Sequence, residues 1–330
     1  MDREFFESEK EKYIIDGDKV LNLPGPFKLE LPEIYQIEIC SVCNFNCIMC
    51  PKELYSREKD SKLINPELIE SMIGRGELEG SYLIELQMTG EPLLHPDIQS
   101  IIDLIKTTGV MVGLSTNGHL LTDKFVMNRL RGLDYITISL DSVSERRNIR
   151  KGFNKSFEEW YEENLKDSIY ALSFQETTID VQFIDLPDYE REIAEFSSIA
   201  TEILSLVTIR TVPEGYFTLV HQGLYPALDK GICLNPFLSV SIQSQGHVVP
   251  CCFAWGDDYI YGDIEKQSLK EIWNHEKVKL LRAAHQYRPL ANDHLLPEMC
   301  KRCYMRSPTF LHTNILYQSI RAKKGRWSIG

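Results

Sequence analysis

Nine cysteines in this 330-residue chain fall into two groups, and thiolates are strong ligands for iron and zinc. Four lie between residues 40 and 50, five lie between residues 233 and 303, and the stretch from Pro51 to Ile232 contains none. Cysteines kept only for packing would be scattered, so this clustering favours metal binding. The first residues are charged and lack an apolar signal core, so we expect a cytoplasmic protein, in whose reducing surroundings disulfides are rare.

The first group contains the spacing C-x3-C-x2-C, formed by Cys43, Cys47 and Cys50 directly after a strand-like segment. A structural zinc site needs four protein ligands. A [4Fe–4S] cluster held by three thiolates keeps one iron without a protein ligand, and that iron can bind and reduce a small molecule. Zinc with Cys40 as its fourth ligand, and a cluster that only carries electrons, remain alternatives.

The second group surrounds an expected hairpin and consists of Cys233, Cys251, Cys252, Cys300 and Cys303. Four thiolates suit either tetrahedral zinc or a second [4Fe–4S] cluster, and the spacing does not choose between them. The hairpin is expected to pair SVSIQ (239–243) with HVVPCC (247–252) around a turn at Gln245-Gly246. Because neighbours on a strand face opposite sides, only one of the adjacent cysteines should reach the metal.

Between the two groups, strand-like and helix-like segments alternate, which predicts parallel pairing with right-handed crossovers. Six such units suit a curved sheet or open barrel, with ligands at the carboxyl ends of the strands. Around residue 213 the pattern changes, and a single helix is expected at 268–287. The expected strands are 35–40, 83–88, 110–116, 135–141, 177–184 and 206–212, and the expected helices between them are 97–109, 123–133, 156–173 and 188–204.

The motifs resemble those of the radical S-adenosylmethionine (SAM) superfamily. The cysteine loop with Asn44 is that family's signature, and MTGEPLLHPD (88–97) resembles its glycine–glutamate–proline motif, with Thr89 in place of the first glycine. LSTNG (114–118) and ISLDS (138–142) resemble the ends of its third and fourth strands. The resemblance implies an α/β fold, a partial (β/α)6 TIM-like barrel.

The C-terminal cysteine segment resembles the extension called SPASM, or its shorter form, twitch. Five cysteines are too few for two further clusters, so the resemblance implies one auxiliary [4Fe–4S] cluster in a small α+β domain. Its ligands would be Cys233, Cys251, Cys300 and Cys303, with Cys252 as an alternative to Cys251. We therefore expect an N-terminal extension (1–33), a barrel (34–220) and a twitch-like domain (221–330).

The resemblance also implies a mechanism, in which the open iron chelates SAM and an electron from the cluster yields a 5′-deoxyadenosyl radical that abstracts a hydrogen atom. Arg150 would grip the SAM carboxylate, unless it belongs to a solvated face, and the backbone at Glu91 would accept from the SAM ammonium, unless this glutamate caps the next helix. Glu38 and Cys40 share one side of the first strand, and Cys40 is interpreted as a packed thiol. The expected SAM contacts are Thr89, Gly90, Glu91, Ser115, Asn117, Ser139, Asp141, Arg150 and Gln182.

A second cluster favours net oxidation, because a substrate radical must then lose its remaining electron. We expect a dehydrogenase acting on a small polar molecule, such as a sugar or aminocyclitol alcohol, with Arg210 and Glu214 as candidate substrate contacts. The alternative is an epimerase of a sugar or peptide, with the Cys252 thiol as hydrogen donor. A third possibility is an electron carrier or scaffold without turnover.

Few residues precede the first expected strand, so an N-terminal peptide-binding or cobalamin domain is not expected. The net charge of −12 argues against nucleic acid or an anionic membrane as partner, and no stretch approaches the roughly 20 apolar residues of a membrane span. The expected protein partner is an electron donor such as flavodoxin or ferredoxin.

Overall fold

The computed structural model describes residues 29–47, 50, 62–144, 155–185, 189–213, 233, 235–254, 259–286, 296–297 and 300. Their strands form one nine-stranded sheet in the order β6-β5-β4-β3-β2-β1-β7-β8-β9. The strands are β1 (Glu33–Ile37), β2 (Leu83–Glu85), β3 (Met111–Thr116), β4 (Tyr135–Asp141), β5 (Thr178–Asp185), β6 (Thr208–Pro213), β7 (Ser239–Ile242), β8 (His247–Val249) and β9 (Gly262–Asp263).

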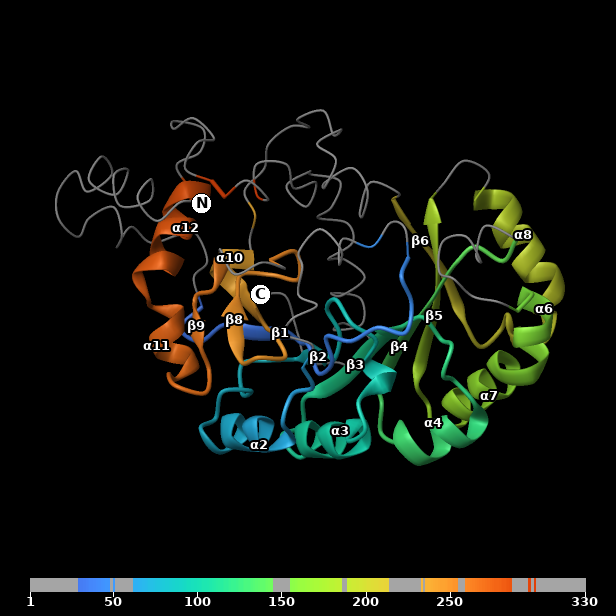
Figure 1. Ribbon diagram of the computed structural model, residues 1–330, viewed down its shortest axis with the longest axis horizontal. Helices are drawn as coiled ribbons and strands as arrows, with labels where there is room; N and C mark the ends of the chain where they lie inside the picture. The colour runs from blue at the N-terminus through green and yellow to red at the C-terminus, as the bar shows by residue number, and fades with distance from the viewer. Residues whose placement is uncertain are drawn as a thin grey trace, which may run out of the picture.

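Strands β1 to β6 are parallel, and each lies beside its successor in the chain. Helices connect them along the outer side of the curved sheet, as Figure 1 shows. This topology confirms the expected partial barrel. The connecting elements are α2 (Pro66–Gly74), η3 (Pro92–Leu94), α3 (Ile98–Lys106), α4 (Asp123–Arg129), α6 (Phe157–Trp160), the π-helical turn η4 (Tyr161–Leu165), α7 (Lys166–Phe174), α8 (Tyr189–Ile199) and η5 (Thr201–Ile203).

The strands present one apolar and one polar face. On β4, Ile136, Ile138 and Leu140 belong to the hydrophobic core, whereas Thr137 and Ser139 alternate with them and face the other way. The apolar face packs under the helices, because that contact removes it from water. The polar face is therefore the inner face of the barrel.

The second cysteine region continues the barrel sheet. Strand β7 lies parallel to β1, with Ile34 beside Val240 and Ile37 beside Ile242, and β8 and β9 follow in antiparallel order. The remaining helices are α10 (Asn235–Leu238), α11 (Leu269–Trp273) and α12 (Glu276–Gln286). The expected limit between residues 220 and 221 lies outside the described residues and stays a prediction.

Two expectations for this region are wrong in detail. The hairpin turns at Gly246, whose φ of +83° suits glycine, but β8 ends at Val249 because Pro250 has no N–H for the ladder. Cys251 and Cys252 thus lie in a turn after the strand, and the argument that their side chains face opposite sides of a strand fails. The helix expected at 268–287 is two helices, because Asn274 ends α11 with its side chain donating to the Lys270 carbonyl (2.7 Å).

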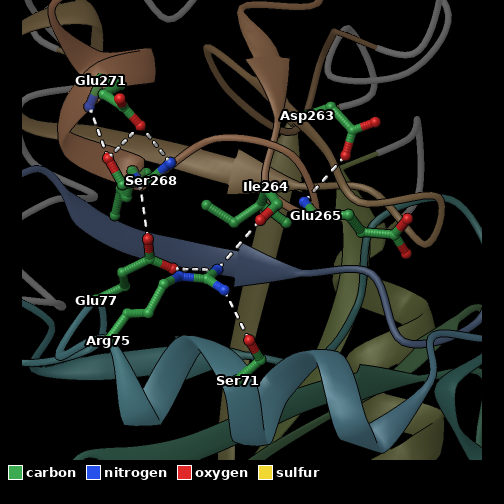
Figure 2. Close-up of polar contacts among 9 residues, drawn as sticks. Ser71, Arg75, Glu77, Asp263, Ile264, Glu265, Ser268 and Glu271 are labelled. Carbon is green, nitrogen blue, oxygen red and sulfur yellow. Dashed lines mark hydrogen bonds and ion pairs between the residues drawn. The ribbon is translucent and has the colours of Figure 1, made fainter.

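A polar latch joins the barrel to the second region (Figure 2). Arg75, just after α2, donates to Glu77 (2.8 Å) and to the Ile264 carbonyl (3.1 Å). Glu77 is buried and accepts from the backbone N–H of Leu269 (2.8 Å), the first residue of α11. The carboxylate therefore also meets the positive end of a helix.

Among the described helices, none combines the length and hydropathy that crossing a membrane requires.

Candidate metal and cofactor site

The first cysteine loop follows β1, and its thiols at Cys43, Cys47 and Cys50 are half-buried. Two contacts fasten the loop to neighbouring strand ends. The Glu91 N–H donates to the Val42 carbonyl (2.7 Å), and the Asn117 side chain donates to Asn44 Oδ1 (2.8 Å). The loop is thereby held against the residues that follow β2 and β3.

Gly90 lies against the backbone of this loop. A Cβ atom on residue 90 would come within 2.1 Å of the Cys40 carbonyl oxygen and 2.7 Å of the Ser41 carbonyl carbon and Val42 oxygen. All three are backbone atoms, which cannot rotate away as a side chain can. Only glycine therefore allows the motif and the cysteine loop to approach this closely.

The Glu91 side chain has the capping role that was the alternative to SAM binding. Its Oε1 accepts from the Leu93 N–H (3.1 Å) and from the Thr116 hydroxyl (2.7 Å), and its Oε2 accepts from the Asn117 N–H (2.9 Å). This buried carboxylate ties η3 to the end of β3. The expected contact between the backbone here and the SAM ammonium stays a prediction.

Thr89, which replaces a glycine of the family pattern, has a partner in Glu38. Its hydroxyl and its N–H both donate to Glu38 Oε1. Glu38 Oε2 accepts from the N–H (3.2 Å) and hydroxyl (3.1 Å) of Ser244 in the β7–β8 turn. One fully buried carboxylate thus connects the glycine–glutamate–proline motif with the second region.

Cys40 is the packed thiol that the sequence predicts. It is buried, its Sγ donates to the Val42 carbonyl (3.4 Å), and burial raises its pKa to about 11.

The other expected SAM contacts line the carboxyl ends of β3, β4 and β5. The Ser115 and Ser139 hydroxyls lie 3.3 Å apart, and Gln182 is the register partner of Ser139. The side chain of Asn117 is already bonded, to Asn44 and to the His119 N–H. Asp141 has a φ of +64° beside a register irregularity, and such strain in a non-glycine residue is concentrated at functional sites. Arg150 lies outside the described residues.

The loop after Asp141 is clamped by Glu192 of α8. Its carboxylate accepts from the Ser142 hydroxyl and from the N–H and hydroxyl of Ser144. Burial alone would raise the pKa of Glu192, but these bonds outweigh it and the net pKa is lowered. The clamp is therefore an ionised carboxylate at neutral pH.

A network of polar side chains extends across the inner face of the barrel. Gln36 (3.2 Å) and Gln87 (2.9 Å) both donate to Glu85, and Gln87 also accepts from the Ser115 N–H (2.8 Å). Burial raises the pKa of Glu85. In this half of the network, Gln36 lies on β1, Glu85 ends β2, and Gln87 lies two residues after β2.

The other half of the network lies on β4, β5 and β6. The Tyr135 hydroxyl donates to Asp180 and accepts from Thr137 (3.1 Å). Arg210 donates to the Tyr135 oxygen (3.2 Å) and pairs with Asp180 (3.5 Å), and its side chain keeps 31% exposure. Of this network the sequence predicted Arg210 alone; polar residues at every second position of otherwise buried strands were the available signal. Glu214 lies outside the described residues.

The described thiols of the second cysteine site are half-buried, as those of the first loop are. Cys233, Cys251 and Cys300 come from three separate segments, and Cys300 packs against the hydrophobic core. Burial raises the pKa of Cys233 to about 11 and that of Cys251 to about 12. Thiolates in such surroundings need a bound cation. Cys303 lies outside the described residues, and whether Cys252 is a ligand stays open.

Within the described ranges, no three His, Cys, Asp or Glu side chains lie close enough together to bind a single metal ion. The fit to iron–sulfur clusters rests on the donor sets. Each region supplies several described thiols, which are the soft ligands that such clusters use, and in the first loop the Phe45 N–H is directed at Cys43 Sγ (3.5 Å).

Comparison with known families agrees with both regions. The family model of the radical SAM superfamily matches residues 37–168. The model of SPASM, an iron–sulfur cluster-binding domain, matches residues 233–304 and so includes all five cysteines of the second group.

Individual relatives are distant. A tungsten-containing aldehyde ferredoxin oxidoreductase cofactor-modifying protein of Pyrococcus furiosus is 22% identical over 82% of this chain and 86% of its own length. A probable GTP 3′,8-cyclase of Methanococcus maripaludis is 29% identical over 48% of this chain, which spans only 55% of that relative.

Two solved structures show the same fold. BtrN in complex with AdoMet and 2-DOIA aligns with a TM-score of 0.53 at 17% identity, covering 83% of this chain and 93% of BtrN. Streptococcus suis SuiB bound to the precursor peptide SuiA aligns with a TM-score of 0.60 at 13% identity, covering 94% and 85%.

Proposed function

Because the chain belongs to the radical SAM superfamily and carries a SPASM domain after its barrel, we propose that it oxidises a small polar alcohol, of the sugar or aminocyclitol class, to a ketone. Cys43, Cys47 and Cys50 would hold a [4Fe–4S] cluster, and Cys233, Cys251, Cys300 and Cys303 an auxiliary one. Together with SAM, these groups supply a hydrogen-abstracting radical and an electron acceptor.

SAM would be the net oxidant of this reaction, because its conversion to methionine and 5′-deoxyadenosine consumes the two electrons that the alcohol loses once the auxiliary cluster returns its electron to the first cluster. An external donor, of the flavodoxin or ferredoxin kind, supplies one electron, which cleaves SAM to methionine and a 5′-deoxyadenosyl radical. The substrate carbon gives a hydrogen atom to that radical, and 5′-deoxyadenosine is formed. The substrate radical then loses one electron to the auxiliary cluster and one proton from its hydroxyl, which completes the ketone.

The chain's own residues would position the reactants. Ser115, Ser139 and Gln182 offer hydroxyl and amide groups for the SAM ribose at adjacent strand ends. Gly90 lets the motif after β2 approach the cysteine loop, and the backbone at Glu91 is proposed to accept from the SAM ammonium. The SAM carboxylate is assigned to Arg150.

The observation that carries the choice of a polar substrate is the network on the inner face. Asp180 and Arg210 can recognise hydroxyl or amino groups, since one accepts and the other donates with charge. Two buried atoms farther along the sheet, Gln36 Oε1 on β1 and Ser241 Oγ on β7, have no hydrogen-bond partner among the described residues. An apolar substrate would leave these groups unsatisfied, whereas a polyol would satisfy them.

The test is turnover by the reconstituted, reduced holoenzyme with polyols and aminocyclitols deuterated at the carbinol carbon. We expect one ketone per 5′-deoxyadenosine, with the deuterium in the 5′-deoxyadenosine. Asp180→Asn and Arg210→Ala should lower kcat/KM by about 10–100-fold, since each removes a charge-assisted bond to substrate worth about 1.5–3 kcal/mol. Cleavage of SAM without substrate should persist in both variants.

Other outcomes identify the alternatives. A product of unchanged mass that takes up solvent deuterium, and that is lost in Cys252→Ala, would establish an epimerase. Turnover of a peptide and of no polyol would overturn the substrate class. Absence of 5′-deoxyadenosine from protein that holds its cluster would leave an electron carrier.

A further inference from the structure

Tyr261 presents an unusual hydroxyl group. Its side chain is buried, with 6% exposure, and its Oη has no hydrogen-bond partner among the described residues. Its backbone N–H is bonded to the Val248 carbonyl (2.8 Å), which fixes the residue beside the strand that leads to Cys251. A buried phenol without a partner costs about 1–3 kcal/mol, so the position calls for an explanation.

Three cysteines of the second site lie within electrostatic range of this hydroxyl. Cys300, Cys251 and Cys233 all lie close enough to act on it electrostatically, although they come from three separate segments of the chain. The unpartnered donor therefore lies in the same neighbourhood as three of the expected auxiliary ligands.

Arg282 of α12 is a second unusual group at the same place. Its guanidinium is buried, lies 3.9 Å from the Trp273 ring centroid, and donates to the carbonyls of Pro236 (2.7 Å) and Trp273 (3.0 Å). Across the described residues, no carboxylate forms an ion pair with it. The carbonyl groups satisfy its hydrogen bonds but leave a buried positive charge without a counter-ion.

The Tyr261 hydroxyl and the Arg282 guanidinium lie in the same part of the second region. Tyr261 and Arg282 act on one another electrostatically, and Pro236, which accepts from Arg282, lies three positions after Cys233. The site thus offers one unused donor and one unneutralised cation to whatever the cysteines bind. A cluster held by four thiolates is an anion whose charge increases on reduction, and it fits both.

We infer that Tyr261 donates its hydroxyl hydrogen to a sulfur of the auxiliary cluster and that Arg282 supplies the counter-charge, so that together they raise its reduction potential. The inference rests on the auxiliary cluster of the proposed function. Hydrogen bonds to cluster sulfurs and nearby charge are the means by which proteins set such potentials. A raised potential makes the cluster a better acceptor for the electron of the substrate radical.

The test is a redox titration, followed by electron paramagnetic resonance, of full-length protein in which Cys43, Cys47 and Cys50 are replaced by alanine. Only the auxiliary cluster then gives a signal. In this background Tyr261→Phe should keep the iron and sulfide content, because the hydroxyl has no partner to lose among the described residues. We expect the equilibrium constant for reduction to fall about tenfold, equivalent to about 59 mV for a one-electron couple.

Three further variants make the result specific. Tyr161→Phe is the matched control, because Tyr161 Oη is likewise buried without a partner among the described residues but lies in η4, on the barrel. The reduction potential of the auxiliary cluster should not change in this variant. Arg282→Gln should lower the potential, and Arg282→Lys should restore most of it. The pulsed spectrum of the unaltered background should show a proton coupling in H2O that disappears in D2O. Tyr261→Phe should lack this exchangeable coupling in both solvents.

The outcomes separate this inference from the proposed function. Zinc without sulfide in the triple-alanine background would remove the auxiliary cluster and with it the proposed function. A cluster that is present but keeps its potential in Tyr261→Phe, or shifts equally in Tyr161→Phe, would overturn the inference alone.

Discussion

The two cysteine regions are neighbours across β1, which has β2 on one side and β7 on the other, yet they are built in opposite ways. The first is a single loop with half-buried thiols, fastened through backbone and uncharged polar groups. The second gathers cysteines from separate segments beside a buried tyrosine and a buried arginine. One region depends on local sequence and close backbone approach, and the other depends on tertiary assembly.

This difference corresponds to different chemical needs. A cluster that must admit SAM needs an accessible iron and small neighbours, which the loop and Gly90 offer. A cluster that only exchanges electrons gains from dry surroundings, where a nearby charge or hydrogen bond acts most strongly on its potential. Each region can therefore be disturbed separately, and the expected effects differ in size.

The largest effect is expected from Gly90→Ala. The added Cβ would meet three backbone atoms of the cysteine loop at 2.1–2.7 Å, so the loop must move, at about 3 kcal/mol or more. We expect loss of the first cluster and of SAM cleavage, with the second cluster retained. Iron and sulfide analysis together with the electron paramagnetic resonance signal of each cluster would measure this.

Gly74→Ala is the matched control for that substitution. A Cβ on Gly74, the last residue of α2, would have nothing within 4 Å, and alanine is the better helix former. Both clusters should then be present at the level of the unaltered protein. Equal loss of both clusters in Gly90→Ala would show that the two regions are not independent.

A smaller effect, on stability, is expected at the latch of Figure 2. Glu77→Ala removes the buried acceptor of the Leu269 N–H and leaves Arg75 without its carboxylate. Because the Arg75 side chain keeps 35% exposure and water can solvate it, we expect a loss of about 2–3 kcal/mol in the free energy of unfolding. Denaturant unfolding followed by circular dichroism would measure it.

The control for the latch is an ion pair of the same neighbourhood. Lys266 pairs with Asp263 at 2.6 Å, but its side chain keeps 77% exposure. Lys266→Ala should leave the unfolding midpoint nearly unchanged, because surface pairs contribute little. If Glu77→Ala lowered the free energy of unfolding as little as Lys266→Ala does, the docking of α11 would depend on apolar packing and not on Glu77.

The contrast between the regions also explains what could be predicted from the sequence. The first site is contiguous, so its spacing and the order of strand-end motifs were sufficient to predict the cysteine loop, Gly90 and the serines at the ends of β3 and β4. The barrel followed from alternating strand and helix patterns, and the topology confirms it. The SAM contact assigned to the Glu91 backbone stays a prediction, and the capping role of its side chain depends on where Thr116 and Asn117 lie, which the sequence does not show.

The parts that the sequence did not reveal are non-local. The alternation of polar residues along buried strands was a local signal for Glu85, Asp180 and Arg210, but nothing local indicated that Tyr261 and Arg282 would lie together near the second cysteines. The end of β8 at Val249 was missed because the prolyl residue after it was counted as part of the strand. The pairing of β7 with β1 likewise joins residues about 200 positions apart, which no periodicity can predict.

The smallest effect is expected at Glu38, where the regions meet. Ser244→Ala removes one of the bonds to Glu38 Oε2 and leaves the bond from the Ser244 N–H (3.2 Å) in place. A hydrogen bond to a buried carboxylate contributes about 1.5 kcal/mol. Because the remaining donors still satisfy the Glu38 carboxylate, we expect the free energy of unfolding to fall by about that amount. Ser241→Ala is the matched comparison on the same strand-turn unit, since its hydroxyl is buried without a partner among the described residues and its removal should leave stability unchanged or slightly raised. A greater loss in Ser241→Ala than in Ser244→Ala, measured as the shift of the unfolding midpoint, would mean that Glu38 does not connect the two regions and that packing of β7 on β1 does so alone.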